Sequence, residues 1–323
     1  MATLMNSSPN WLPATRLNAW PLADWMMKIS RQTVASALKS LPAKLSHISE
    51  TPVLDAQVLL AHATGKTRTW LLAHPETVLT ETELATVKEA IAHLQQGMPL
   101  PYVLGHWEFF GLDFLVTPDT LIPRPETELL VERALHWLQA APHRRSLADV
   151  GTGSGCIAIS LAKHIPDLWV VATDLSLPAL KVTQKNACRH DVQKRIDLIQ
   201  CDLLPPHSNY LATRSHFDLI CANLPYIPSS TLHQLPVYGR EPSLALDGGT
   251  DGLDLIRRLL NIAPEWLAPG GAIFLEIEAS QGAAVLSLAY DTFHQAHISL
   301  EKDLTGSDRL VCIQTIGNNG LIG

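Results

Sequence analysis

The feature that most restricts the fold of this chain is a regular alternation of strand-like and helix-like segments from residue 146 onward. Short apolar runs separated by helical patterns are typical of βαβ units, which build parallel sheets with helices on both faces. The expected strands are residues 146–150, 169–173, 196–201, 217–222 and 272–277. The expected helices are residues 156–164, 178–190, 252–262 and 279–289. We therefore expect an α/β fold with a doubly wound, mostly parallel sheet.

The last two strand-like segments are expected to run antiparallel to each other. Residues 297–304 and 309–315 are separated by only a short turn that contains Gly306. Parallel strands need a long crossover, whereas antiparallel strands can be joined by a few residues. This pair is expected to close the sheet.

The chain before residue 124 lacks this alternation and is predicted to be mainly helical. A length of 323 residues favours one large domain and one small one. Residues 1–45 are expected to form a partly helical N-terminal extension, and residues 46–100 a helical domain. Residues 101–123 mix aromatic and β-branched residues around Gly111, which indicates a β-hairpin linker. The large domain is then expected to span residues 124–318.

Charge and composition limit the classes of function. The chain has 24 basic and 31 acidic residues, for a net charge of −7, which disfavours a protein that binds mainly to a nucleic-acid backbone. No apolar run approaches the roughly 20 residues of a transmembrane helix, and the N-terminus has no signal-peptide pattern. The five cysteines and fourteen histidines show no metal-ligand spacing. We expect a cytoplasmic protein that has no metal site and binds no membrane.

A glycine-rich loop follows the first strand of the large domain, with the sequence Asp149-Val150-Gly151-Thr152-Gly153-Ser154-Gly155. Glycines let the backbone approach a ligand closely, and the helix N-terminus behind them supplies free N–H groups. Asp174 ends the next strand, where a ribose diol is held in such folds. The close glycine spacing and the upstream Asp149, suited to an amino group and a sulfonium, favour S-adenosyl-L-methionine over a dinucleotide. The alternative is a glycine turn that serves packing only.

The third strand ends in Cys201-Asp202-Leu203. This position predicts a contact of Asp202 with the amino group of adenine and of Leu203 with the face of its ring, although Asp202 as a turn or capping residue is nearly as plausible. The expected cofactor-binding residues are Gly151, Thr152, Gly153, Ser154, Gly155, Asp174, Asp202, Leu203 and Asn223.

The strand at residues 217–222 ends abruptly in Asn223-Leu224-Pro225-Tyr226. Proline prevents continuation of the strand, so Asn223 is expected at the carboxyl end of a central strand, where open α/β sheets bind ligands. The side-chain oxygen of Asn223 and the carbonyls of Leu224 and Pro225 are acceptors, and Tyr226 offers an aromatic face. This set suits a planar group that carries an NH2. The alternative is a strand end at which Tyr226 packs in the core.

Taken in order, these motifs resemble the peptide chain release factor glutamine N5-methyltransferase family over roughly residues 46–315. Besides the glycine loop, the resemblance rests on Leu54-Asp55-Ala56-Gln57-Val58-Leu59-Leu60, Pro101-Tyr102-Val103-Leu104-Gly105, Glu108-Phe109-Phe110-Gly111, Leu121-Ile122-Pro123-Arg124-Pro125-Glu126-Thr127-Glu128, Glu241-Pro242-Ser243-Leu244-Ala245-Leu246, Gly248-Gly249 and Asp251-Gly252. It implies a helical domain that helps to bind a protein substrate, a hairpin linker and a seven-stranded, Rossmann-like class I methyltransferase domain. It also implies the substrate, which is the glutamine of the Gly-Gly-Gln loop in class I release factors, and a monomeric enzyme.

The sequence departs from the family pattern at one position. The family's tetrapeptide is Asn-Pro-Pro-Tyr, and this chain has Leu224 at the second position. The acceptor at that position is a backbone carbonyl, which leucine keeps, while one fixed φ angle is lost. We expect the site to be retained with a looser geometry.

The expected chemistry is direct, in-line methyl transfer to an amide nitrogen, with Asn223, Pro225 and Tyr226 as the catalytic residues. All four residues of the tetrapeptide, Asn223, Leu224, Pro225 and Tyr226, are expected to bind the substrate. An amide nitrogen is a poor nucleophile, because its lone pair is delocalised into the carbonyl. Acceptors that hold both N–H hydrogens would orient the nitrogen and stabilise the positive charge that develops on it. The alternatives are an adenine-N6 DNA or RNA methyltransferase, a glutamine methyltransferase of a ribosomal protein, and a silent cofactor-binding adaptor.

Overall fold

The computed structural model describes residues 32–205 and 216–317, which divide into two compact units, with the division between Lys88 and Glu89. Each unit is described by itself. Of the predicted N-terminal extension, residues 1–31 lie outside the described residues. In the described ranges, no helix combines the length and apolar character needed to cross a membrane.

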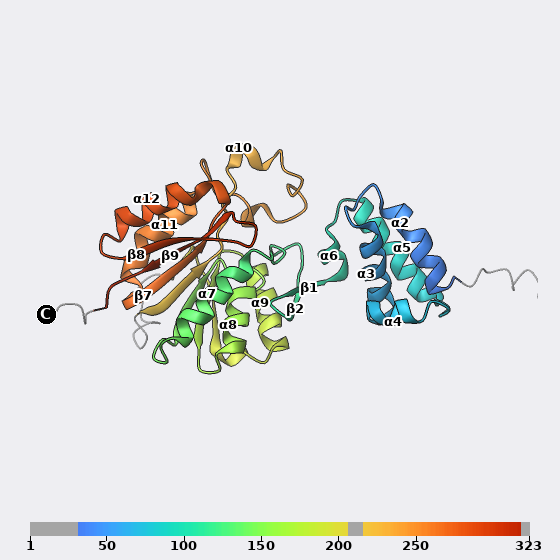
Figure 1. The fold of residues 1–323 in the computed structure, drawn as a ribbon, viewed down its shortest axis with the longest axis horizontal. Helices are drawn as coiled ribbons and strands as arrows, with labels where there is room; N and C mark the ends of the chain where they lie inside the picture. Colours follow the sequence, from blue (N-terminus) through green and yellow to red (C-terminus); the bar gives the residue numbers. More distant parts are fainter. Residues whose placement is uncertain (1–31, 206–215, 318–323) are drawn as a thin grey trace, which may run out of the picture. The chain divides into compact units, whose positions relative to one another are not determined.

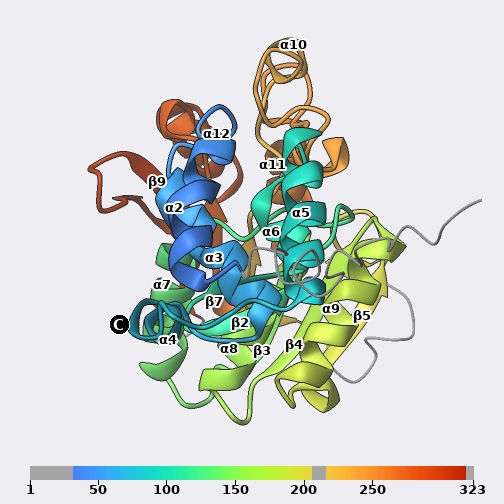
Figure 2. The ribbon, with the colours of Figure 1, turned by 90° about the vertical axis from the view of Figure 1, so that its right-hand side faces the viewer.

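The first unit is a small helical bundle, blue to cyan in Figures 1 and 2. It contains α2 (Val34–Leu45), α3 (Pro52–Thr64), α4 (Arg68–Ala73) and the start of α5 (Glu81–Gln95). Helix α3 ends at Thr64, and Gly65 caps it with a φ of +63°, a conformation that glycine adopts readily.

The boundary that the sequence predicts at residue 45 differs from the one in the structure. Helix α2 packs along α3 through a buried face made of Val34, Ala37, Leu41 and Leu45. Residues 34–45 are therefore part of the bundle and not of an extension. Pro42 lies inside α2, and a proline at that place is a poor sign of a continuing helix.

The hairpin is part of the second unit. It follows α6 (Leu100–Leu104) and consists of β1 (His106–Phe109) and β2 (Leu112–Leu115), which pair antiparallel. Phe109 and Phe114 are buried in the core of that unit. The side chain of Asn186, on α9 (Leu177–Arg189), accepts a hydrogen bond from Leu115 N and donates one to Leu115 O, at 2.7 and 3.0 Å. The predicted linker is thus anchored to the large unit.

The large unit is built on one seven-stranded sheet with the strand order β5-β4-β3-β6-β7-β9-β8. The strands are β3 (Ser146–Val150), β4 (Trp169–Asp174), β5 (Ile196–Gln200), β6 (Phe217–Ala222), β7 (Leu267–Glu276), β8 (His297–Lys302) and β9 (Asp308–Gln314). Strands β3 to β7 pair in parallel, and β9 is antiparallel to both β7 and β8. The predicted fold class and the closing antiparallel pair are confirmed.

Helices cover both faces of this sheet (Figure 1). They are α7 (Thr127–Gln139), α8 (Cys156–His164) and α9 on one face, and α11 (Asp254–Ile262) and α12 (Gly282–Thr292) on the other. In β6, Leu219 and Cys221 pack in the core of the first face, while Ile220 and Ala222 pack in the core of the second. This alternation explains why a central strand reads as one unbroken apolar run.

Candidate active site

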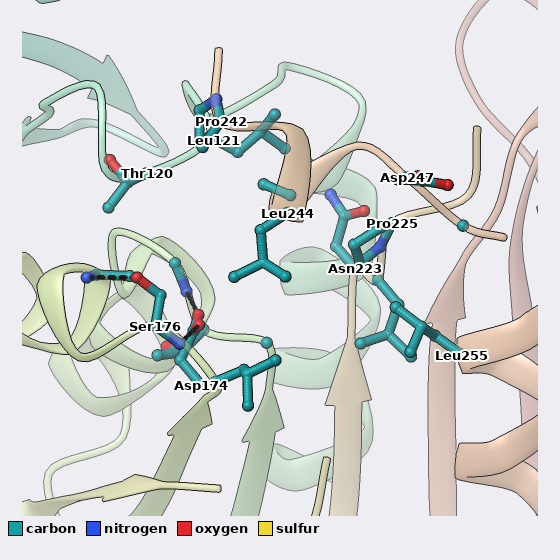
Figure 3. A pocket seen from close by; sticks show the side chains of 18 of the residues that line it. Thr120, Leu121, Asp174, Ser176, Asn223, Pro225, Pro242, Leu244, Asp247 and Leu255 are labelled. Carbon is teal, nitrogen blue, oxygen red and sulfur yellow. Dashed lines mark hydrogen bonds between the residues drawn. The ribbon is translucent and has the colours of Figure 1, made fainter. Parts of the chain in front are cut away.

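A cavity of about 620 Å³ lies at the carboxyl ends of strands β3 to β6 (Figure 3). Its wall includes residues 151–154 after β3, 174–176 at the end of β4, 201–203 after β5 and 223–225 after β6. In Figure 3, Asp174 lies on one side of the cavity and Asn223 on the other, with Leu244 between them. Of the twelve predicted site residues, all except Gly155 and Tyr226 line the cavity.

The glycine loop is held by the strand and the helix that follow it. Asp174 Oδ2 accepts a hydrogen bond from Gly153 N at 2.9 Å, and Thr173 O accepts one from Thr152 N at 2.9 Å. From α9, Thr183 Oγ1 donates to Gly153 O at 2.8 Å. Asn186 Nδ2 donates to Ser154 O at 2.8 Å. A Cβ at Gly153 would meet nothing closer than 4.0 Å, so the fixed backbone leaves room for a ligand beside it.

Asp149, the last residue but one of β3, holds the glycine loop through buried hydrogen bonds. Asp149 is fully buried, and its Oδ2 accepts hydrogen bonds from Thr152 Oγ1 at 2.6 Å and from Ala158 N at 3.1 Å. Burial raises the pKa of Asp149 to about 6. Asp149 does not line the cavity, so a direct contact with a cofactor's amino group is not what the structure shows.

Gly155, which was expected to bind the cofactor, does not line the cavity. It takes φ +83° immediately before α8, where a Cβ would come within 2.6 Å of the side chain of Thr183. A glycine is needed at this position because α8 and α9 approach each other closely. The structure thus gives Gly155 a packing constraint against Thr183.

The end of β5 contributes Asp202 and Leu203 to the cavity wall. Leu203 has φ +64°, which is unusual for a non-glycine residue, and its carbonyl accepts a hydrogen bond from Thr173 Oγ1 at 2.6 Å. Its side chain is buried against the second core. Asp202 forms a half-exposed ion pair with Arg258 on α11, at 2.6 Å. Sequence reasoning did not foresee this arginine, which also lines the cavity.

The end of β6 places unused acceptors beside the cavity. Asn223 Nδ2 donates a hydrogen bond to Thr127 Oγ1 at 3.0 Å. The other end of the same amide, the side-chain oxygen Oδ1, takes no part in this bond. Among the described residues, no hydrogen bond is made to Asn223 Oδ1 or to the carbonyl oxygens of Leu224 and Pro225. Leu224 is buried, and its Cδ2 would lie 3.2 Å from a Cβ at Gly151. The leucine of the tetrapeptide is thus packed against the glycine loop.

Two glycines support the turn after Asn223. A Cβ at Gly248 would lie 2.7 Å from Pro225 O, and a Cβ at Gly252 would lie 2.3 Å from Tyr226 O. The Tyr226 carbonyl also accepts a hydrogen bond from Gln281 Nε2 at 3.0 Å. These close approaches give a physical reason for the glycines that the family resemblance includes.

Tyr226 was expected to offer an aromatic face to the substrate, and it is absent from the cavity wall. It is mostly buried, and burial together with the charge of Glu276 raises its pKa to about 12. Glu276 is the last residue of β7 and only 2% exposed, and burial raises its pKa to about 7. Sequence reasoning did not single out this carboxyl group.

The wall formed by residues 119–124 is fixed by a second buried carboxylate, Glu241. It accepts hydrogen bonds from Arg124 Nη2 at 2.5 Å and from Ile122 N at 3.1 Å. Tyr102 Oη donates to Thr120 O at 2.6 Å in the same segment. Two motifs of the resemblance, around Arg124 and Glu241, therefore meet at the cavity. In the described part of the chain, no cluster of three or more potential ligands is arranged to hold a metal.

Comparison with known proteins identifies the family of this chain. The PrmC N-terminal domain family matches residues 36–105, and the methyltransferase small domain family matches residues 126–234. A release factor glutamine methyltransferase of Moorella thermoacetica is 43% identical over 280 residues, which cover 86% of this chain and 96% of that protein. The chain belongs to the release factor glutamine methyltransferase family.

Two further members of the family are also similar in sequence to this chain. A release factor glutamine methyltransferase of Geobacter sulfurreducens is 40% identical over 260 residues, which cover 80% of this chain and 88% of that protein. The crystal structure of a release factor-specific protein-(glutamine-N5) methyltransferase from Alicyclobacillus acidocaldarius is 31% identical. It covers 63% of this chain and 99% of its own, with a TM-score of 0.38.

Membership in the release factor glutamine methyltransferase family confirms three expectations. The chain is a methyltransferase enzyme, its cofactor is S-adenosylmethionine, and the sequence resemblance was correct. The cavity fits that cofactor, since it combines an open glycine loop, the carboxylate of Asp174 and the apolar side chain of Leu203.

We expect Gly252→Ala to disrupt the turn that holds Asn223. Alanine would be strained at φ +80°, and its Cβ would collide with Tyr226 O. Gly306→Ala is the matched control, because Gly306 has φ +84° and open space around its Cβ position. Both variants should lose about 1 kcal/mol of unfolding free energy from strain. Only Gly252→Ala should lose methyl transfer as well, and equal activity of the two variants would contradict the steric role.

The buried carboxyl of Glu276 predicts a specific pH dependence of stability. Its pKa in the folded protein, about 7, lies above the usual 4.5, so the folded state holds this proton more tightly than the unfolded state. The protonated carboxyl group therefore adds to the free energy of unfolding. This contribution is fully present below pH 4.5 and is lost as the pH rises through about 7. The rise in the pKa of Glu276 corresponds to a loss of about 3 kcal/mol of unfolding free energy between these two pH values.

We therefore expect the unfolding free energy of the wild type to fall by about 3 kcal/mol more than that of Glu276→Gln over this pH range. Urea denaturation at a series of pH values measures the difference. Parallel curves for the two proteins would show that Glu276 does not titrate in this way.

Proposed function

We propose that this enzyme methylates the side-chain amide nitrogen, N5, of the glutamine in the Gly-Gly-Gln motif of class I peptide chain release factors. The observation that carries the proposal is Asn223, whose side chain lies beside the cavity next to the carbonyl oxygens of Leu224 and Pro225, which accept no hydrogen bond within the described part of the chain. The named activity of the relatives, release factor glutamine methylation, supports the same substrate.

The proposed cofactor contacts follow the cavity wall. Residues 151–154 hold the methionine part, Asp174 the ribose hydroxyls, Asp202 the adenine amino group and Leu203 the adenine face. Bound there, S-adenosylmethionine supplies an electrophilic methyl group. The ion pair of Asp202 with Arg258 leaves carboxylate lone pairs for a further donor.

The proposed substrate contacts use hydrogen-bond acceptors. Asn223 Oδ1 and the carbonyl oxygen of Leu224 or Pro225 each accept one N–H of the glutamine amide. Two acceptors fix the direction of the nitrogen and stabilise positive charge that develops on it during transfer. Stacking by Tyr226 finds no support in the cavity wall, so the contacts that we propose are those of Asn223, Leu224 and Pro225.

The substrate class is tested by offering isotope-labelled cofactor with a release factor, a ribosomal protein, or DNA and RNA. We expect label on the release factor, at the glutamine of its Gly-Gly-Gln motif. Label on nucleic acid would show an adenine methyltransferase, and label on the ribosomal protein alone would move the substrate to the ribosome. The enzyme is further proposed to act as a monomer, which sedimentation of the same sample would check.

We expect Asn223→Ala to reduce methyl transfer by at least 100-fold, because loss of one positioned hydrogen-bonding group commonly costs about 100- to 1,000-fold. The affinity for S-adenosylmethionine, measured by calorimetry, should change less than about threefold. Asn261→Ala, at an exposed position of α11, is the control and should resemble the wild type. Turnover of Asn223→Ala near the wild-type rate would overturn the pairing of the amide hydrogens.

We expect Asp174→Ala to weaken cofactor binding by at least tenfold. The substitution removes the proposed acceptor for the ribose and also the anchor of Gly153 N. Asp291→Ala, at an exposed position on α12, is a control of equal charge change. Calorimetry that gave equal affinities for the two variants would contradict the ribose assignment.

A further inference from the structure

Leu224 gives the turn after Asn223 a hydrogen-bond donor that a proline would lack. The family's tetrapeptide, Asn-Pro-Pro-Tyr, has no backbone N–H at its second position, whereas Leu224 carries one. Leu224 is only 4% exposed and lines the cavity. Strand β6 ends at Ala222, so this N–H lies beyond the hydrogen-bond ladder of the sheet. Within the described part of the chain, it donates no hydrogen bond.

A buried backbone N–H without a partner is rare in proteins, because the group gives up its bond to water and gains no other. The backbone of Leu224 is held on both sides. Its side chain packs against the glycine loop, with Cδ2 3.2 Å from the position that a Cβ would take at Gly151. Pro225, which follows, has a fixed φ angle. The acceptor for this N–H is therefore expected from a molecule bound in the cavity.

The direction of the N–H follows from the proline behind it. A residue that precedes proline is disfavoured in the helical region and takes an extended backbone. In an extended residue the N–H and the C=O point to the same side, as in paired strands where two residues exchange both bonds. The N–H and the C=O of Leu224 therefore face the same neighbour. The C=O also has no hydrogen-bond partner within the described residues.

Leu224 O has more room for a substrate than Pro225 O. A Cβ at Gly248 would lie 2.7 Å from Pro225 O, so the backbone of Gly248 occupies the space on one side of that oxygen. None of the described glycines approaches Leu224 O in this way. Leu224 O is therefore the better acceptor for a hydrogen of the glutamine amide.

A primary amide has two hydrogens to donate and one oxygen that accepts. With Asn223 Oδ1 and Leu224 O on the two hydrogens, the amide oxygen is still without a partner. We propose that the backbone N–H of Leu224 donates a hydrogen bond to this oxygen, so that Leu224 exchanges two bonds with the glutamine amide. This inference rests on the proposed function, and it adds a binding group that the family's tetrapeptide lacks.

The bond from Leu224 contributes to binding and not to the methyl-transfer step. The oxygen of an amide is partly negative, because the nitrogen lone pair is delocalised onto it. As that lone pair forms the bond to the methyl group, the delocalisation and the charge on the oxygen both decrease. The hydrogen bond is therefore weaker in the transition state than in the bound substrate, so its loss raises KM and does not lower kcat.

The first test compares Leu224→Pro with Leu224→Ala. Both variants lose the leucine side chain, but only proline removes the N–H. We expect the KM of Leu224→Pro for the release factor to be roughly three- to tenfold above that of Leu224→Ala, which is the usual contribution of one hydrogen bond. The kcat of Leu224→Pro should be no lower than that of Leu224→Ala. Equal KM values, or a loss in kcat instead, would overturn the proposal.

The second test changes the N–H and keeps the side chain. Nonsense suppression inserts the α-hydroxy analogue of leucine at position 224, which puts an ester oxygen in place of the N–H. We expect KM for the release factor to rise by roughly three- to tenfold over the wild type. The same replacement at Leu304, a fully exposed leucine in the turn between β8 and β9, is the control and should leave KM unchanged. An unchanged KM at position 224, or weaker binding of S-adenosylmethionine in its place, would overturn the proposal.

A third test observes the N–H itself by nuclear magnetic resonance. The dipeptide Asn-Leu occurs once in the sequence, so a carbon isotope at the asparagine carbonyl and a nitrogen isotope at leucine select the signal of Leu224. In protein saturated with the demethylated cofactor, we expect this proton signal to move downfield when a release factor is added. A release factor whose Gly-Gly-Gln glutamine is replaced by alanine should not produce this shift.

The outcomes separate this inference from the proposed function. If the wild type methylates the release factor but the Leu224 signal responds equally to both forms of it, only the inference on the N–H fails. If the wild type methylates no release factor, the proposed function and this inference both fail.

Discussion

The register of three neighbouring strands is the constraint on which the site depends. Val150 of β3 pairs with Thr173 of β4 on one side and with Ala222 of β6 on the other. The next residue along each strand is Gly151, Asp174 or Asn223, and all three line the cavity. Three segments that lie far apart in the sequence therefore deliver a backbone loop, a carboxylate and an amide to the same edge of the sheet. A shift of one residue in either pairing would separate them, because side chains alternate between faces.

Most of the large unit could be predicted from sequence, because its local and long-range signals agree. The helix at residues 156–164 matches α8, and the strand at residues 217–222 matches β6. Both are apolar runs bounded by clear breaks, a glycine on one side of α8 and Asn223 after β6. Because the strands run in parallel, their carboxyl ends meet at one edge of the sheet, so the residues that follow them can be assigned to one site.

The failures of prediction have physical causes. A series of glycines indicates that other atoms come close to the backbone, but it does not show whether they belong to a ligand or to the protein. Gly155, which lies close to Thr183, therefore could not be distinguished by sequence from the glycines that line the cavity. Tyr226 follows a turn whose direction is set by Gly252 and Gln281, residues about 25 or more positions later in the chain. Glu276 gives no local signal, since a carboxylate at the end of a strand reads as a surface residue until the strand's neighbours are known.

The hydrogen bonds of Asn186 join two parts of the large unit that have separate tasks. One side chain holds both carbonyl and amide of Leu115 in the hairpin and the carbonyl of Ser154 in the glycine loop. Asn186 is fully buried, so none of these three hydrogen bonds can be replaced by solvent without opening the structure. Opening of the hairpin at Leu115 would therefore also remove a support of the glycine loop, because the same side chain holds both segments.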